Sequence, residues 1–241
     1  MLYIHKEKIE NYECFDLEET TSTNDEIKNI KDLSAPTIIT TQKQTKGRGR
    51  RGRNWEPIHG NLFFSYNLKF DAKDLSKLVC LVGLSLAKTI KSLSLSLDVK
   101  IKWPNDVMVN GGKISGILIE NIKDNYWSIG IGVNIVASPN INNSNYTPTS
   151  LKEHGIILDR MEFLRYYMKN FNKDYKQYLD NGFELVKKQW LELALNLDKN
   201  VTIQNEQIQK KGKFITLDDN GYLILKNNDK EEKIIAGDLF I

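Results

Sequence analysis

Residues 42–55 are the stretch that most limits how this chain can fold. They combine glycine with dense positive charge, and no apolar side chain lies between Ile39 and Trp55. The cations fall within eleven residues and are Lys43, Lys46, Arg48, Arg50, Arg51 and Arg53. Guanidinium groups about 6 Å apart repel by roughly 0.7 kcal/mol in water, and a glycine-rich backbone loses much entropy on ordering. We therefore expect a mobile loop outside the core that a polyanion, either nucleotide phosphate or nucleic acid, orders.

The glycines of this loop also spell a dinucleotide-binding fingerprint, because Gly47, Gly49 and Gly52 follow the Gly-x-Gly-x-x-Gly spacing. That fingerprint must open a helix after a strand, whereas residues 53–57, Arg-Asn-Trp-Glu-Pro, do not begin an amphipathic helix. The match on its own is weak. A solvated basic run or a nucleic-acid-binding patch stays open as an alternative from the loop alone.

Length and composition indicate an ordinary globular protein. The 241 residues, 40% of them hydrophobic, suit one large domain or one domain with a small appendage. The formal net charge is only +3, and much of the excess lies in the basic loop, which argues against a general nucleic-acid binder with a basic face. Residues 1–7 lack the apolar region of a signal peptide, and the longest apolar stretch, residues 79–87, is too short to span a bilayer. We expect a soluble cytoplasmic protein.

Cysteine and histidine give no sign of a metal site. Cys14 and Cys80 are too few and too far apart in sequence for a disulfide framework or a Cys-x-x-Cys site, and we expect them to be buried hydrophobes or free thiols. His5, His59 and His154 show no paired spacing. We therefore predict no metal centre built from protein ligands.

Hydrophobic periodicity predicts a mixture of strands and helices. A helix is expected to begin near Thr23, with Glu26 three residues later forming a capping box. Strands are predicted over residues 14–18, 37–42, 62–69, 99–102, 106–110, 113–122 and 126–135. Helices are predicted over residues 75–93 and, broken near Asn181-Gly182, over residues 159–196. Short strands return from residue 201, so we place a domain boundary near residues 196–200 and predict an α+β sheet followed by a small barrel-like module.

A second marked stretch is Lys-Trp-Pro-Asn-Asp at residues 102–106, followed by Gly-Gly-Lys-Ile-Ser-Gly-Ile-Leu-Ile-Glu at residues 111–120. Lys102 ends one predicted strand and Lys113 begins another beyond an Asn-Gly turn, so both ammonium groups are expected to approach one site. Gly116 and the glycines of the next strand remove side chains in mid-strand, which lets a flat ligand approach the backbone. The alternative is that the glycines serve strand curvature and that Lys and Asp solubilise turns.

Four motifs follow one another along the chain: Gly-Arg-Gly-Arg-Arg-Gly-Arg, Lys-Trp-Pro-Asn-Asp, Gly-Lys-Ile-x-Gly-Ile-Leu-Ile-Glu and Gly-Ile-Gly-Val-Asn. With these motifs in this order, the chain resembles the biotin protein ligases, also called biotin–[acetyl-CoA-carboxylase] ligases. The resemblance covers residues 14–155 in detail and continues faintly to Gly237-Asp238. It implies a class II synthetase-like catalytic domain over residues 1–197, with a mixed, mostly antiparallel central sheet and flanking helices. It also implies a small SH3-like β-barrel over residues 198–241.

The resemblance implies a two-step reaction. Biotin and ATP give biotinyl-5′-adenylate and pyrophosphate, and a lysine of a biotin carboxyl carrier protein domain then takes the biotin and releases AMP. Clustered cations suit this chemistry because they bring two anions together and stabilise charge at the α-phosphate. A mobile loop that closes shields the anhydride from water. Mg²⁺ is implied with ATP, bound largely through the phosphates.

By position, the resemblance also implies roles for individual residues. Biotin contacts fall on Ser22, Thr23, Gln44, Gly47, Arg48, Arg50, Lys113, Gly116 and Ile117. ATP contacts fall on Arg50, Arg53, Trp55, Lys102, Asn105, Lys113 and Asn134. Catalytic roles fall on Arg50, which holds the adenylate, on Lys113, which faces the biotin carboxyl and the α-phosphate, and on Asp106 as a helper for the incoming lysine amine.

Some features depart from the usual pattern of this family. Lys46 and Asp25 stand where other members often have uncharged residues, and residues 200–241 lack the glycine pattern expected of the C-terminal domain. About a dozen residues precede the first predicted strand, too few for the DNA-binding domain that some members carry. We therefore expect a ligase without direct DNA regulation, and we leave a homodimer open.

Two alternatives remain. A lipoate ligase or a lipoyl transferase would share the sheet and the acyl-lysine product, although the Gly-Arg-Gly-Arg-Arg-Gly-Arg loop favours biotin. A nucleic-acid-binding module would use the loop and Trp55 and predicts binding that falls steeply with salt. That second alternative leaves Lys-Trp-Pro-Asn-Asp without a role.

Overall fold

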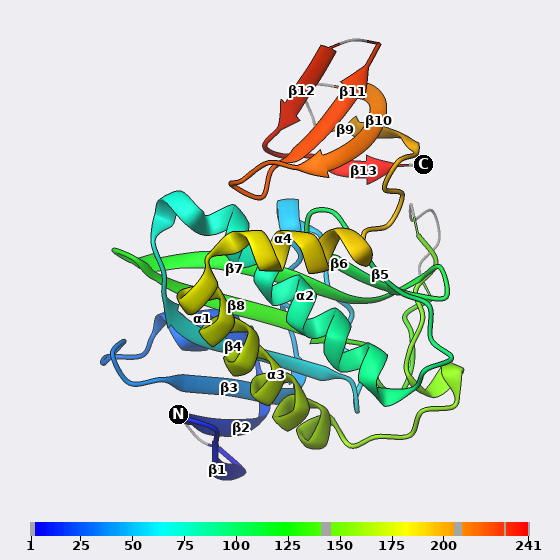
Figure 1. Ribbon diagram of the computed structural model, residues 1–241. Helices are drawn as coiled ribbons and strands as arrows, with labels where there is room; N and C mark the ends of the chain where they lie inside the picture. Colours follow the sequence, from blue (N-terminus) through cyan, green and yellow to red (C-terminus); the bar gives the residue numbers. More distant parts are fainter. Residues whose placement is uncertain (1–2, 141–145, 205–208, 229, 241) are drawn as a thin grey trace. The chain divides into compact units, whose positions relative to one another are not determined.

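The computed structural model describes residues 3–140, 146–204, 209–228 and 230–240 (Figure 1). The chain divides into two compact units, one made of residues 1–73 and 112–169 and the other of residues 74–111 and 170–241. Within the described residues, no helix is both long enough and apolar enough to cross a membrane.

The first unit is built on strands that lie in the order β1-β2-β3-β4-β8-β7 (Figure 1). Their bounds are β1 His5–Ile9, β2 Tyr12–Thr20, β3 Thr37–Gln44, β4 Leu62–Lys69, β7 Gly112–Lys123 and β8 Tyr126–Val133. β2 and β3 run parallel, and the other neighbouring pairs of this unit run antiparallel. The predicted mixed, mostly antiparallel sheet is confirmed.

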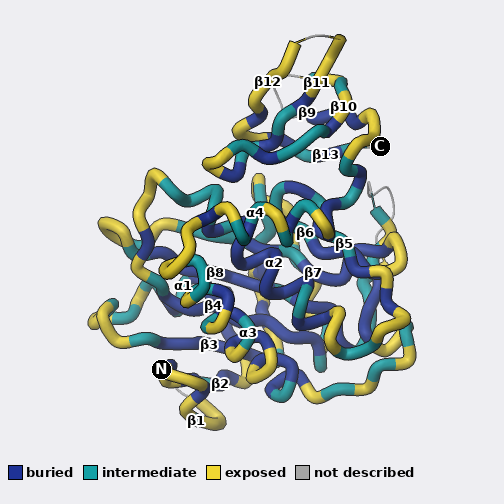
Figure 2. The backbone as a smooth tube through the Cα atoms, in the orientation of Figure 1, coloured by how far each residue is buried: buried dark blue, intermediate teal, exposed yellow. Residues whose placement is uncertain are grey.

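β4 forms the middle of this sheet, and both of its faces are buried (Figure 2). On one face Ser65 meets α1, a short helix over Thr23–Lys28. On the other face Tyr66 shares a 2.9 Å hydrogen bond between hydroxyls with Tyr167 of α3, the helix Arg160–Asn181. The strand was predicted correctly, but residues 62–67 are buried without alternation because a helix covers each side.

The start of α1 differs from the capping box that the sequence suggested. Ser22 is the N-cap, and its backbone carbonyl accepts the N–H groups of Asp25 and Glu26, each at 3.1 Å. Thr23 is the first helical residue, and its side chain turns to other partners. The carboxylate of Glu26 accepts a 2.6 Å hydrogen bond from Thr20. The predicted pairing of Thr23 with Glu26 was wrong because both side chains have partners outside the helix.

The second unit combines helices with the hairpin of β5 and β6. Its elements include α2 Leu75–Leu93, β5 Val99–Lys102, β6 Asp106–Val109, the end of α3, and α4 Phe183–Glu192. α2 occupies the range that its periodicity predicted. The predicted break between the last two helices is confirmed at Gly182, whose φ of 73° suits glycine. Short 3₁₀ turns lie at Ala72–Asp74 and, in the first unit, Lys152–His154.

The end of the chain forms an antiparallel sheet in the order β12-β11-β10-β9-β13. The strands are β9 Asn200–Gln204, β10 Gln209–Leu217, β11 Leu223–Asn227, β12 Lys230–Ile234 and β13 Asp238–Phe240. Phe214 of this sheet packs edge-on against Trp190 of α4, with ring centroids 6.4 Å apart. The predicted β-rich C-terminal module is confirmed as a sheet. The predicted barrel is not seen among the described strands, because the edge strands β12 and β13 do not pair with each other.

Candidate active site

The first group of predicted biotin contacts gathers where α1 begins. Ser22 and Thr23 are buried there, and Gln44 reaches them from the end of β3. The Oε1 atom of Gln44 accepts the backbone N–H of Thr23 at 2.8 Å and lies 3.1 Å from the Thr23 hydroxyl. That hydroxyl lies 2.7 Å from the hydroxyl of Ser65 on β4. The structure thus brings Ser22, Thr23 and Gln44 together in one buried polar cluster.

Asn24 completes this cluster, and sequence reasoning did not single it out. Its Oδ1 accepts hydrogen bonds from the hydroxyls of Ser65 at 2.7 Å and Ser128 at 2.8 Å, and its Nδ2 donates to Glu120 at 2.7 Å. Because Ser65 gives its one proton to Asn24, the single proton of the Thr23 hydroxyl faces two acceptors, the Ser65 oxygen at 2.7 Å and Oε1 of Gln44 at 3.1 Å. The only sign in the sequence was the Ser-Thr-Asn run, which is equally typical of a helix cap.

The basic loop closes on itself as a narrow turn. Arg48 and Asn54 form an antiparallel bridge, and the N–H of Trp55 donates to the carbonyl of Gly47 at 3.0 Å. The 3₁₀ turn Arg50–Gly52 lies at the tip. β4 follows the loop, so no helix begins where a dinucleotide fingerprint requires one. The prediction that the loop is mobile without a ligand stays a prediction.

Trp55 packs onto a pair of glycines in the sheet. Gly116 of β7 and Gly132 of β8 lie directly opposite each other in the ladder, and we call this pair the glycine platform. A Cβ on Gly116 would lie 3.0 Å from Cζ3 of Trp55, and a Cβ on Gly132 would lie 2.5 Å from its Cε2. The Nζ atom of Lys113 lies 5.5 Å from the centre of the Trp55 ring and 4.6 Å from that of Tyr146. The flat group that meets the platform in this structure is therefore the indole.

Lys113 is held at this position by its own backbone. Its N–H donates to the carbonyl of Thr147 at 2.8 Å, and its carbonyl accepts the N–H of Thr149 at 2.9 Å. The Nδ2 of Asn134 donates to the Thr149 carbonyl at 3.0 Å. Only 9% of Lys113 is exposed. The amide of Asn134 therefore positions the segment that flanks Lys113, while its expected contact with adenine or ribose stays a prediction.

The side chain of Arg48 is engaged by two carboxylates. Its Nη1 and Nη2 donate to Asp25 at 2.7 and 2.6 Å, and Nη2 lies 3.4 Å from Glu120. The Nζ of Lys28 is 3.2 Å from the same glutamate. The hydrogen bond from the Arg48 guanidinium lowers the pKa of the Asp25 carboxyl. The same hydrogen bond, seen from the other side, raises the pKa of Arg48. This ion pair was not predicted from the sequence.

The remaining predicted residues are divided between the two units. Ile117 is buried in β7, and Arg53 ends the 3₁₀ turn of the basic loop. Lys102, Asn105 and Asp106 belong to the second unit, where Lys102 and Asp106 lie opposite each other in the β5–β6 hairpin. The predicted approach of Lys102 and Lys113 to one site stays a prediction.

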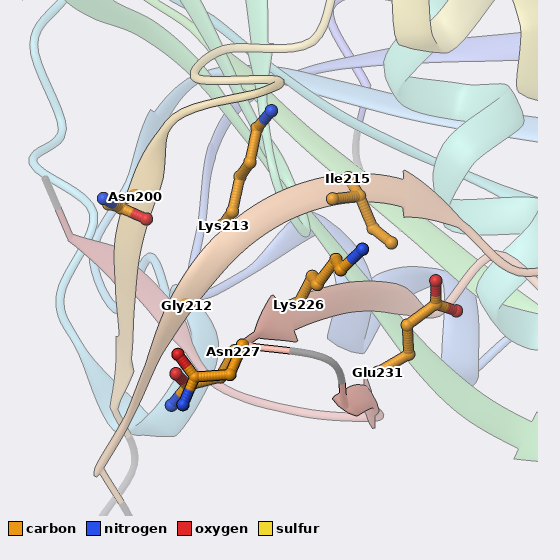
Figure 3. A pocket seen from close by; sticks show the side chains of 8 residues that line it. Asn200, Gly212, Lys213, Ile215, Lys226, Asn227 and Glu231 are labelled. Atoms are coloured by element: carbon orange, nitrogen blue, oxygen red, sulfur yellow. The ribbon is translucent and has the colours of Figure 1, made fainter.

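Among the described residues, neither a metal-binding cluster nor a reactive thiol competes with this site. The described residues contain no group of three or more His, Cys, Asp or Glu side chains that could hold a metal ion. Burial raises the pKa of Cys14 and of Cys80 to about 12, so both thiols behave as small hydrophobes. A hollow on the C-terminal sheet has mixed charge (Figure 3) and is lined by Asn200, Gly212, Lys213, Ile215, Lys226, Asn227, Asn228 and Glu231.

Family comparisons cover both ends of the chain. Residues 14–134 match the model of the Biotin/lipoate A/B protein ligase family. Residues 197–241 match the Biotin protein ligase C terminal domain. Because the second domain is named for biotin protein ligases, it favours biotin over the lipoate alternative.

Individual relatives agree with the family models. The chain is 31% identical over 231 residues to the bifunctional ligase/repressor BirA of Bacillus subtilis, covering 91% of this chain and 71% of the relative. It is 31% identical over 236 residues to the biotin–[acetyl-CoA-carboxylase] ligase of Paracoccus denitrificans, covering 93% and 98% of the two chains. The biotin protein ligase of Aquifex aeolicus, solved in complex with biotin and ATP, has a TM-score of 0.83 and 28% identity and covers 94% of this chain and 97% of its own. This chain therefore belongs to the biotin protein ligases of the biotin/lipoate A/B protein ligase family.

Proposed function

We propose that this chain joins biotin and ATP to give biotinyl-5′-AMP and pyrophosphate, and then transfers biotin to a lysine of a biotin carboxyl carrier protein domain with release of AMP. The observation that carries the proposal is Lys113, whose ammonium group is largely buried yet lies beside Trp55 at the glycine platform. A shielded cation beside an aromatic ring suits the anionic groups of the reaction, the biotin carboxylate and the α-phosphate of ATP.

The polar cluster at the start of α1 supports recognition of the ring end of biotin. Biotin carries a ureido group with N–H donors and a carbonyl acceptor. Thr23 and Gln44 offer a hydroxyl and an amide, and the hydrogen bonds between them and to Ser65 fix their orientation. Buried polar groups that are already oriented bind a complementary ligand at little cost in entropy. We assign the ureido group to this cluster.

The first step places two anions together, and the cations of the site oppose their repulsion. The biotin carboxylate attacks the α-phosphorus, an O–P bond to biotin forms, and the bond to pyrophosphate breaks. Lys113 stabilises the charge that develops on the α-phosphate oxygens, and Arg50 of the basic loop holds the adenylate once it has formed. Positioning of the two substrates supplies much of the remaining acceleration.

The second step forms an amide bond to the acceptor lysine. The lysine amine attacks the carbonyl carbon of the mixed anhydride, the bond to the AMP oxygen breaks, and the amine gives up a proton to solvent water. Asp106 is the residue that we assign to help the amine. The closed basic loop protects the anhydride from water until the acceptor arrives.

ATP brings the metal ion with it in this proposal. Mg²⁺ binds mainly through phosphate oxygens and water. The acceptor partner is a carrier domain of a carboxylase, and the place of action is the cytoplasm. A homodimer is compatible with the proposal but is not required by it.

The test is ATP–pyrophosphate exchange by the purified full chain with Mg²⁺ and biotin, lipoate or neither acid. We expect exchange with biotin alone, followed by transfer of biotin to a carrier domain added afterwards. Exchange with lipoate and not with biotin would show that the acid substrate is lipoate and would overturn the assignment of biotin. No exchange with either acid would overturn adenylate formation, and nucleic-acid binding measured at two salt concentrations would then test the alternative use of the loop.

A further inference from the structure

We propose that Asp25 is a positioning residue for the reaction proposed above: its carboxylate holds Arg48 and so keeps the basic loop closed at the glycine platform. The inference rests on the proposed function, because the loop retains an adenylate only if one is made. Asp25, Arg48 and the platform all belong to the first unit.

The contact between the two side chains has a fixed geometry. Both Nη atoms of Arg48 bond to the two oxygens of Asp25, at 2.7 and 2.6 Å. Two parallel bonds of this kind orient a guanidinium group as well as attract it. The side chains are 34% and 38% exposed, so solvent and salt weaken the pair without removing its direction.

Fixing Arg48 also fixes the two arms of the basic loop. The backbone of Arg48 bridges to Asn54 on the opposite arm. Its neighbour Gly47 accepts the N–H of Trp55, and a Cβ on Gly47 would lie 2.7 Å from the Trp55 carbonyl oxygen. A restraint on the side chain of Arg48 therefore reaches Trp55, which covers the glycine platform.

The partner end of the contact is anchored in the turn that carries the predicted biotin contacts. Asp25 lies in the first turn of α1, two residues after Thr23. Glu120 links the same elements a second time, because it accepts from Asn24 at 2.7 Å and lies 3.4 Å from Arg48. Two contacts therefore connect the basic loop to the start of α1. One is the ion pair between Arg48 and Asp25, and the other is the carboxylate of Glu120, which lies near both Asn24 and Arg48.

The consequence for the reaction concerns retention of the adenylate more than its formation. Opening of the loop must break the Asp25–Arg48 pair, so the pair lowers the fraction of time that the loop is open. An exposed, well-oriented pair is worth enough to change that fraction by about fivefold. In this arrangement the guanidinium of Arg48 is bound to Asp25. The contacts that this part of the loop makes with the ligand then come from its backbone.

The experiment uses the full chain with Asp25→Asn, which keeps the size of the side chain and removes its charge. Enzyme is loaded with labelled biotin, ATP, Mg²⁺ and pyrophosphatase, and the loss of bound biotinyl-5′-AMP is followed after removal of free ligand. We expect the variant to lose the adenylate about fivefold faster than the wild type. Its exchange rate at saturating biotin should fall much less. Asp25→Glu should restore part of the retention.

The matched control is Glu19→Gln. Glu19 pairs with Lys43 at 2.7 Å between β2 and β3, with side chains 48% and 51% exposed, so its loss removes a comparable ion pair that does not hold Arg48. It should retain the adenylate as the wild type does. Raising the salt from about 0.05 to about 0.5 M should speed the loss more in the wild type and in the control than in Asp25→Asn, which lacks the ion pair that salt weakens.

Failure of this inference can be told apart from failure of the proposed function. If the wild type exchanges pyrophosphate with biotin and Asp25→Asn keeps its adenylate as long as the wild type, the role of Asp25 is overturned. If the wild type shows no biotin-dependent exchange, the proposed function fails. In that case trypsin cleavage at residues 48–53 of the ligand-free chain decides the role of Asp25. Faster cleavage of Asp25→Asn than of Glu19→Gln supports it, and equal rates overturn it.

Discussion

Lys113 is the single residue on which the proposed chemistry depends most. Its ammonium group lies near the rings of Trp55 and Tyr146, in a position that is 9% exposed. We expect Lys113→Ala to lower biotin-dependent ATP–pyrophosphate exchange by at least about 100-fold, because removing one group that stabilises transition-state charge commonly costs that much. Lys113→Gln, which keeps a polar end on a side chain one atom shorter and removes the charge, should be nearly as impaired. Exchange close to the wild-type rate in Lys113→Ala would remove this residue from the site.

Gly132 tests whether the glycine platform has to be bare. An added Cβ would lie 2.5 Å from Cε2 and 2.7 Å from Nε1 of Trp55, so the indole must move. Overpacking of this kind costs about 1–3 kcal/mol, and we expect Gly132→Ala to raise the KM for biotin at least about tenfold in the exchange assay. Gly49→Ala is the control, since its Cβ would come no nearer than 3.5 Å to its neighbours. Equal KM values for the two variants would contradict the role of the platform.

The sequence predicted some residues of the site and missed others for a physical reason. Thr23, Gln44 and Lys113 were predicted as site residues from their places in the motifs, and their contacts with a ligand stay predictions. The Asp25–Arg48 ion pair joins residues 23 positions apart, and the bond from Asn24 to Glu120 spans 96 positions. Which distant side chains meet is decided by the pairing of the strands, and no local pattern records it.

Elements were predictable where the local pattern decides their structure. The apolar spacing of residues 75–93 predicted the bounds of α2, although residues 81–87 are all buried, so the middle of the helix is covered on more than the one predicted face. The burial of β4 was not predictable as alternation, because α1 and α3 cover both faces. Tertiary contacts in the same way replaced the capping box expected at the start of α1.

The basic loop is the element whose change should alter the product of the reaction. We expect Arg50→Gly to release the adenylate, so that lysines of bystander proteins such as serum albumin become biotinylated at least about tenfold faster, which corresponds to ~1.4 kcal/mol of lost retention. Arg51→Gly is the matched control: it removes one charge from the same turn at a residue whose φ of 56° suits glycine. Tight retention by Arg50→Gly, or equal bystander labelling by the two variants, would count against Arg50 as the residue that holds the adenylate.

At the scale of the whole molecule, the predicted domain boundary and the two compact units divide the chain at different places. The predicted boundary places residues 1–197 in one domain and 198–241 in another, and it stays a prediction. The second compact unit combines residues 74–111 with residues 170–241, so α2 and the β5–β6 hairpin group with the C-terminal strands. Composition shifts mark where a segment ends, but they do not show which earlier segment it packs against.

This grouping predicts that the C-terminal sheet stabilises the helices of its unit. Trp190 of α4 is fully buried and packs against Phe214 of β10, and Lys187 bonds to Asp219 at 2.9 Å. A chain that ends at residue 197 exposes Trp190, and we expect it to lose roughly 3–5 kcal/mol of unfolding free energy, similar to losing a buried aromatic side chain. Phe214→Ala in the full chain should lower Tm in the same direction. Ile235→Ala, at an exposed position directly after β12, should leave Tm unchanged. If the truncated chain unfolds at the same Tm as the full chain, this prediction is wrong. Residues 198–241 would then be an independent domain whose contacts with α4 add nothing to stability.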